Sequence, residues 1–311
     1  MTDQSVTALS KAEFKAMLGT LPDPPDERDF KLRHRKGQPI LIIPQSVRIF
    51  ESGEYPVLPA AAVILKKFDL RKKMPPIEDQ GQMPWCAAFT ITGGLDYMHK
   101  IDTGDFEDFC EQWGYEEARK IAGLSGSARQ GVYIRSVLKL AQQQGFLPQK
   151  AWSGLKSQPK EKGKKLIKLL ANYKIATYAS VSPRTLDNVK QAMINFGPLY
   201  CAFQIHQGWQ TVGRNGWIPM PQPGERSIGG HGVLLVGWDD KKQGFIIRNS
   251  WGDWGKDGYG FVPYEYFKRY CYSCWSAVDV KGSKDNYGLN DWEKFLQSWP
   301  QWLKKAFGVP F

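Results

Sequence analysis

The chain has 311 residues, a hydrophobic fraction of 42% with 13% aromatic residues, and a formal net charge of +11. This length and composition are ample for a core and predict one large domain or a two-lobed one with extensions. No run of eighteen apolar residues occurs, which excludes an ordinary membrane-spanning helix.

The first 65 residues are rich in proline and charge and have little periodicity. They do not begin with a basic region followed by an apolar core, so we expect no Sec signal peptide. A cytoplasmic protein, or one exported by a Sec-independent route, fits that expectation. The apolar runs at residues 40–43 and 57–58 predict short strands.

A helix that begins at a cysteine is the next predicted element. Pro84 stops any helix that continues from the residues before it. Cys86 opens a compact apolar stretch in which Ile91, Leu95 and Met98 keep helical spacing. Free N–H groups and positive dipole at a helix N-terminus stabilise a thiolate. Cys86 is therefore a candidate nucleophile.

The middle of the chain alternates between loops and regular elements. A helix is predicted at residues 134–144, after a glycine-containing loop at residues 126–131. Residues 156–168 are rich in lysine and predict an exposed loop that leads into a helix. Residues 189–200 predict a helix, a Gly-Pro stop and a strand.

A histidine and an asparagine border two predicted strands near the end of this region. His231 precedes the apolar run at residues 233–236, which is typical of a buried strand. Asn249 ends the run at residues 244–248. The pair therefore lies at strand ends, where functional side chains can meet a helix N-terminus.

The five cysteines do not form the pattern of a disulfide framework. Cys271 and Cys274 form a C-x-x-C, but a zinc site needs two further ligands, and no second C-x-x-C or H-x-x-x-H exists. We expect no metal and no cofactor. The remaining thiols are expected to be mostly reduced, with a Cys271–Cys274 redox pair as the alternative. The other two are Cys110 and Cys201.

The order and spacing of three residues resemble the papain-like cysteine peptidases. Cys86 lies within Asp79-Gln80-Gly81-Gln82-Met83-Pro84-Trp85-Cys86, His231 follows it after 145 residues, and Asn249 comes 18 later. A His and an Asn about 130–150 residues after the Cys are typical of that family. The resemblance covers roughly residues 66–280. It implies an α+β fold with two lobes: a helical lobe with the cysteine and a β-barrel-like lobe with the histidine and asparagine, with the active site in the cleft between.

The resemblance also implies the role of each catalytic residue. Cys86 would attack the acyl carbon as a thiolate, paired with His231. His231 would later protonate the leaving amine, while Asn249 would hold its imidazole. Gln80, six residues before Cys86, matches the family glutamine that stabilises the oxyanion. Two departures, Met83 and Ala87, replace a disulfide cysteine and a tryptophan of many members.

Four further residues are expected at the substrate cleft. Gly131 matches the first glycine of the family pair that hydrogen-bonds an extended substrate backbone, and Val132 replaces the second. An ordinary loop explains residues 126–131 equally well. Gly230 precedes the histidine. Trp251 matches the family tryptophan that covers the Asn–His hydrogen bond.

The implied function is a cysteine endopeptidase that hydrolyses protein or peptide bonds through a thioester on Cys86. Two alternatives stay open: another acyl-transfer enzyme (a transglutaminase-type enzyme, a deamidase or a peptidoglycan amidase), or a non-catalytic binding module. The substrate would be a protein or peptide. Basic clusters could attract an acidic partner, but no nucleic-acid motif accompanies them. A lead-in at residues 21–30 resembles that of bacterial members and indicates a bacterial or phage source.

The expected organisation has three parts. Residues 1–65 form an N-terminal extension or strap, residues 66–280 the catalytic domain, and residues 281–311 an aromatic-rich C-terminal appendage. We expect residues 21–65 to be integral to the folded enzyme, so that activity needs no processing. The rival hypothesis is a plug in the cleft that must be removed. For the C-terminal aromatic residues, packing on the body is expected and membrane binding is the alternative.

Overall fold

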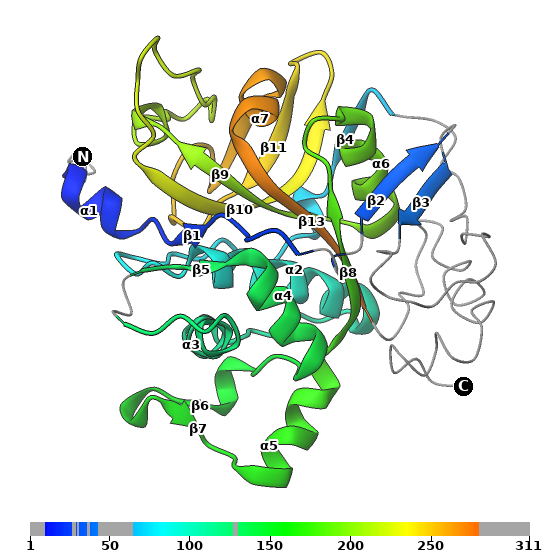
Figure 1. Ribbon diagram of the computed structural model, residues 1–311, viewed down its shortest axis with the longest axis vertical. Helices are drawn as coiled ribbons and strands as arrows, with labels where there is room; N and C mark the ends of the chain where they lie inside the picture. The colour runs from blue at the N-terminus through cyan, green and yellow to red at the C-terminus, as the bar shows by residue number, and fades with distance from the viewer. Residues whose placement is uncertain are drawn as a thin grey trace, which may run out of the picture.

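The computed structural model describes residues 10–26, 29, 31–35, 38–42, 65–126 and 130–279. It has a helical lobe and a sheet lobe, one below the other in Figure 1. The helical lobe contains α2 (Cys86–Thr103), α3 (Glu111–Ile121), α4 (Ile134–Gln143) and α5 (Gly163–Leu170), with the short strands β5 (Val132–Tyr133), β6 (Trp152–Ser153) and β7 (Gln158–Pro159). The helices predicted to begin at the cysteine and near residue 134 are confirmed.

The sheet lobe is built on one sheet of nine strands in the order β12-β11-β10-β9-β13-β8-β2-β3, with β4 paired to β10. Its pairs are antiparallel except β2 with β8. Helices α6 (Leu186–Phe196) and α7 (Tyr264–Tyr270) pack on it. The α+β class is confirmed. The strands are β2 (Lys31–Arg35), β3 (Gln38–Ile42), β4 (Lys67–Asp69), β8 (Ile175–Val181), β9 (Leu199–Ile205), β10 (Gly229–Asp239), β11 (Gly244–Arg248), β12 (Tyr259–Pro263) and β13 (Cys271–Asp279).

Helix α2 joins the two lobes because two adjacent glycines allow it to approach the sheet closely. A Cβ at Gly94 would lie 2.4 Å from the ring of Tyr200 on β9, and a Cβ at Gly93 would lie 3.2 Å from Leu234 on β10. The helix ends at Gly104, whose φ of +89° is the left-handed conformation typical of a helix C-terminus. The close approach fixes the first residue of α2 opposite β10.

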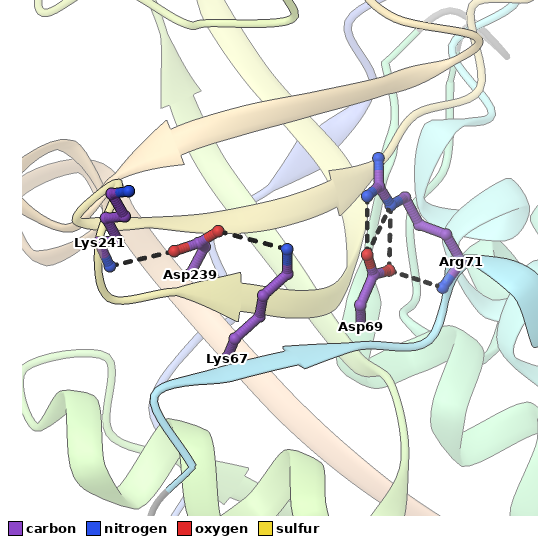
Figure 2. Close-up of polar contacts among 5 residues, drawn as sticks. All are labelled: Lys67, Asp69, Arg71, Asp239 and Lys241. Carbon is purple, nitrogen blue, oxygen red and sulfur yellow. Dashed lines mark hydrogen bonds and ion pairs between the residues drawn. The ribbon is translucent and has the colours of Figure 1, made fainter.

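Strand β4 fastens the chain before α2 to the far end of β10. Asp69 pairs with Gly237 and Lys67 with Asp239, and the ring of Phe68 stacks on Trp238 at 5.0 Å. Figure 2 shows the polar contacts along this edge. Lys67 Nζ lies 3.6 Å from Asp239 Oδ2, the backbone N–H of Lys241 donates to Asp239 Oδ1 at 3.0 Å, and Arg71 forms a two-pronged ion pair with Asp69.

The N-terminal residues form two separate additions to this body. Strands β2 and β3 make a hairpin at the sheet edge, where β2 pairs in parallel with β8. Helix α1 (Lys11–Ala16) and β1 (Thr20–Leu21) instead lie between the two lobes, as the blue segment of Figure 1 shows. The expected strand at residues 40–43 corresponds to β3. The expected strand at residues 57–58 and the appendage at residues 281–311 lie outside the described residues.

We predict that Gly94→Ala lowers the free energy of unfolding by about 1–3 kcal/mol, because the added methyl group overlaps a buried tyrosine that cannot move aside. Urea unfolding measures the change. Gly213→Ala is the matched control, since a Cβ there meets no atom within 4 Å. Equal effects of the two substitutions would contradict the close-packing argument.

Candidate active site

Cys86 is the first residue of α2, directly after Pro84 and Trp85, and its side chain is fully buried. Its Sγ lies 2.9 Å from the hydroxyl Oγ1 of Thr20. Burial raises the pKa of the Cys86 thiol, while the hydrogen bond from Thr20 and backbone N–H groups, including that of Gly232, act in the opposite direction. The thiol is therefore neutral in this arrangement.

His231 is the third residue of β10 and is also fully buried. Its Nε2 lies 2.7 Å from Oδ1 of Asn249, the residue that follows β11. Because an amide oxygen only accepts, Nε2 carries the proton and Nδ1 is left with a lone pair. Nδ1 has no hydrogen-bond partner among the described residues. The imidazole is thus held in the tautomer that can accept a proton at Nδ1.

The backbone after His231 brings β10 to the first turn of α2. A Cβ at Gly232 would lie 2.8 Å from Thr90 Oγ1 and 3.2 Å from the carbonyl oxygen of Cys86. Thr90 in turn donates to that carbonyl at 2.7 Å. A side chain at position 232 would separate the strand from the helix, so glycine here permits the two segments to meet.

Two tryptophans contact the histidine ring, and a third packs on both of them. Trp251 stacks on the His231 ring with centroids 4.2 Å apart. Trp209, fully buried, meets His231 edge-on at 6.0 Å and stacks on Trp254 at 5.9 Å. These rings exclude water from the hydrogen bond between His231 and Asn249. Sequence reasoning identified Trp251 but not Trp209 or Trp254.

The side chain of Gln80 is fixed by hydrogen bonds at both ends. Its Oε1 accepts from the hydroxyl of Ser250 at 2.6 Å, and its Nε2 donates to the carbonyl oxygens of Met17 at 2.8 Å and Met83 at 2.7 Å. Ser250 therefore determines which end of the amide faces the cysteine side. The position of Ser250 next to Asn249 is the signal in the sequence that could have identified it.

Three of the four residues expected to line the substrate cleft surround β1 or the residue before it. Val132 N donates to the Gly19 carbonyl at 2.7 Å, and Thr20 pairs in parallel with Val132. Gly131 has a φ of +74°, and a Cβ there would lie 2.0 Å from the Gly19 carbonyl oxygen. A Cβ at Gly230 would lie 2.1 Å from the Thr20 carbonyl oxygen. The structure thus brings these three residues together around one extended segment.

Contacts with both lobes hold residues 14–23 in place. Phe14, 3% exposed, packs edge-on against Trp251 at 5.0 Å, and Tyr272 donates its hydroxyl hydrogen to the Thr20 carbonyl at 3.0 Å. Asp23 accepts hydrogen bonds from Trp275 Nε1 at 2.9 Å and from the backbone N–H of Arg135 at 3.1 Å. Sequence reasoning missed this arrangement, because residues 10–23 have no periodicity that marks a partner.

Comparisons with known proteins agree with this geometry. The sequence model of the family described as "Papain family cysteine protease" matches residues 64–271. The chain belongs to the papain family. A pea protein, "Cysteine proteinase 15A" of Pisum sativum, is 27% identical over 223 residues, which are 66% of this chain and 59% of the pea protein.

Solved structures of the papain family extend the similarity. Xylellain, a cysteine protease from Xylella fastidiosa, shares 28% sequence identity at a TM-score of 0.65 and covers 85% of this chain and 97% of its own. The digestive procathepsin L2 proteinase of Tenebrio molitor shares the fold at a TM-score of 0.61, with 19% identity and coverage of 89% and 83%. This chain spans less than two thirds of the curated relatives it matches first.

The thiols and the helices of this papain-family chain give two further observations. All five cysteines lie among the described residues, and all are buried free thiols. The family disulfide that position 83 would form is therefore not replaced by another disulfide. Cys271 and Cys274 are not bonded to each other; Cys274 instead lies with its sulfur 3.4 Å from that of Cys201 on the neighbouring strand. None of the described helices combines the length and apolarity that a membrane crossing requires.

We predict a loss of stability in acid that is due to His231. Burial lowers the pKa of His231 to about 4, against an ordinary value of 6.5. Between these two values the unfolded chain binds a proton that the folded chain does not, so stability falls as the pH falls from about 6.5 towards 4. The full effect is about 3 kcal/mol.

Urea unfolding of the wild type and of His231→Gln at pH 7 and pH 4.5 isolates this contribution. The wild type should lose more stability than the variant over that interval, because glutamine does not titrate. The comparison is needed because buried carboxyls with raised pKa values, such as Asp96, act in the opposite direction. Parallel losses in the two proteins would contradict the prediction.

Proposed function

We propose that the chain is a cysteine endopeptidase that hydrolyses protein or peptide amide bonds through a thioester on Cys86. The observation that carries this proposal is the hydrogen bond between His231 and Asn249, which leaves Nδ1 of a buried imidazole free beside the helix that begins at Cys86. Family membership supports the same reaction.

The proposed reaction begins with transfer of the Cys86 thiol proton to His231 Nδ1. The sulfur then attacks the carbonyl carbon of the substrate, and the resulting oxyanion accepts hydrogen bonds from Gln80 Nε2 and the backbone N–H of Cys86. The imidazolium returns its proton to the leaving amine, which departs and leaves the thioester. A water molecule, deprotonated by His231, then hydrolyses the thioester and restores the thiol.

The contacts of residues 10–23 support a second part of this proposal: they cover the active site and must move before a substrate binds. The Met17 carbonyl accepts the hydrogen bond from Gln80 that we assign to the oxyanion. Thr20 lies on the nucleophilic sulfur, and Gly19 occupies the hydrogen-bonding edge at Val132. These contacts favour the plug hypothesis for residues 10–23. The hairpin of β2 and β3, which extends the main sheet, favours the strap hypothesis for residues 31–42.

Partners and location follow from the proposed chemistry only in outline. The substrate is a protein or peptide, and the net charge of +11 favours encounters with acidic partners. A cytoplasmic location, or export by a Sec-independent route, stays a prediction. So does the bacterial or phage source. Another acyl transfer on the same thiolate remains the second candidate, since only the acyl donor and acceptor would differ.

A thiol-reactive epoxide probe combined with a proteolysis assay tests the catalytic assignment. We expect stoichiometric labelling of Cys86 in protein freed of residues 1–23, and no labelling or turnover for Cys86→Ala. Gln80→Ala should still be labelled but should lose about a hundredfold or more in kcat, because its amide acts only once the oxyanion forms. Mass spectrometry of digested protein mixtures separates peptide hydrolysis from other acyl transfer. Labelling at another cysteine, or full turnover by Cys86→Ala, would refute the assignment.

We predict that Phe14→Ala in the full chain increases the rate of probe labelling at Cys86 by at least tenfold. Truncation of a buried phenylalanine costs about 3–5 kcal/mol, and here the loss falls on the docking of residues 10–23 against Trp251. Lys15→Ala is the matched control, because Lys15 is exposed on the same helix. If full-length wild type and Phe14→Ala react equally fast with the probe, residues 10–23 do not limit access to the thiol.

A further inference from the structure

Three carboxylates meet outside the active site, near Arg248 at the end of β11. Glu78 lies in the loop before α2, Asp108 in the loop before α3, and Glu111 is the first residue of α3. One oxygen from each lies within 4.8 Å of the other two. Calcium binds oxygen ligands at about 2.3–2.6 Å, so oxygens on opposite sides of one ion are separated by about 5 Å. The three carboxylates are therefore close enough to share an ion.

Two of these side chains present buried oxygens that accept no hydrogen bond from the described residues, although Arg248 Nη2 lies 3.7 Å from one of them, Glu78 Oε2. Glu111 is 9% exposed, and its Oε1 has no hydrogen-bond partner among the described residues. The same holds for Oε2 of Glu78. A buried carboxylate oxygen without a partner is costly, because it has lost its hydration and gained nothing in return. The unsatisfied oxygens point to a missing positive group.

A fourth carboxyl adds an independent observation. Asp96, in the middle of α2, is 4% exposed, and its Oδ1 is buried without a hydrogen-bond partner in the part of the chain that the structure describes. Glu78, Glu111 and Asp108 all lie close enough to Asp96 for their charges to act on its carboxyl. Asp96 therefore faces the same cluster from the helix behind it.

The positive charge that faces the cluster is the guanidinium of Arg248, and it is poorly matched to four carboxyls. Its Nη2 lies 3.7 Å from Glu78 Oε2 and also donates to the Pro76 carbonyl, while its Nε has no partner among the described residues. With every carboxyl ionised, one guanidinium would leave a net charge of about −3 in a largely buried volume. Such an excess requires either bound protons or a second cation.

We propose that Glu78, Asp108 and Glu111 bind a calcium ion, with Asp96 behind them as a further source of negative charge. The donor set consists of carboxylate oxygens, which hard divalent cations prefer. Magnesium demands near-ideal octahedral geometry and keeps several of its waters, whereas calcium accepts irregular sets of carboxylate oxygens, so a cluster of carboxylates favours calcium. Asp108 is exposed and gives the ion a path from solvent.

The position of Glu78 links this site to the active-site loop. The Glu78 carbonyl accepts a hydrogen bond from Gly252 N at 3.2 Å, and Asp79 forms a β-bridge with Trp251. Gln80 follows directly. A calcium ion at Glu78 would therefore anchor the loop that carries Gln80 to the start of α3. We expect the bound ion to stabilise the folded chain even when the thiol is blocked.

Calcium titration of the chelator-treated full-length chain, with Cys86 blocked, tests this proposal. Isothermal titration calorimetry should show saturable binding of one ion per chain at pH 7.5. Thermal unfolding should shift upwards by roughly 5 °C at a hundredfold excess of calcium over its Kd. Glu111→Gln and Asp108→Asn should each abolish most of both effects. Glu117→Gln, a change on the same helix at a partly exposed carboxylate that pairs with Lys120, is the matched control and should retain them.

The metal-free variants provide the second readout. Glu111→Gln should be at least as stable as the metal-free wild type, because it removes one of several mutually repelling carboxylates. Absence of saturable calcium binding would overturn the proposal and indicate that the carboxyls share protons. Binding that Glu111→Gln and Asp108→Asn leave unchanged would overturn it as well, by placing the ion elsewhere. These readouts do not involve proteolysis, so they stand or fall independently of the proposed enzyme activity.

Discussion

The close packing of α2 against β10 is the constraint on which the active site depends. The cysteine and the histidine come from segments 145 residues apart, and the first turn of α2 meets the backbone of Gly232 rather than a side chain. Gly93 and Gly94 allow the same helix to approach the sheet farther along. The relative position of thiol and imidazole is thus set by backbone contact between the lobes, and their own side chains need only small adjustments.

The burial that protects the hydrogen bond between Asn249 and His231 also keeps the imidazole neutral. Trp251 and Trp209 exclude water from the ring, and residues 10–23 cover the cysteine side. Desolvation then lowers the pKa of the imidazole and raises that of the thiol, so the neutral pair is the stable form. Departure of the covering segment would admit water to the sulfur and favour the ion pair. Access and nucleophile activation are coupled by the same displacement.

Much of the fold and of the candidate site could be predicted because each signal was local. Pro84 followed by a compact apolar stretch marked the beginning of α2, and the apolar run after His231 marked β10. The family spacing then connected Cys86, His231 and Asn249. Gln80 followed from the same resemblance. The contacts that position these residues were harder to foresee, since Ser250 and Trp209 act through neighbours distant in the sequence.

Residues 10–23 and the carboxylate cluster could not be predicted, for a shared physical reason. Thr20 is one threonine among several, and its contact with Cys86 depends on an extended backbone held by Val132 and Tyr272. Glu78 and Glu111 lie 33 residues apart, from 78 to 111, and charged residues in solvated loops look the same in a sequence as charged residues that converge. Residues that are distant in the sequence and meet only in the fold leave no repeating pattern in the sequence. Such contacts are therefore visible only in the folded chain.

Residues 10–23 form hydrogen bonds with Gln80 and Cys86 but do not present a peptide bond in a position to be cleaved. The carbonyl that accepts from Gln80 Nε2 belongs to Met17, whereas the group on the Cys86 sulfur is the side-chain hydroxyl of Thr20. Attack would require the carbon of one carbonyl at the sulfur and the oxygen of that same carbonyl at Gln80. Here the two positions are filled by residues three apart, and the segment runs parallel to β5. If residues 10–23 cover the active site as proposed, this arrangement would not present a peptide bond to the Cys86 sulfur.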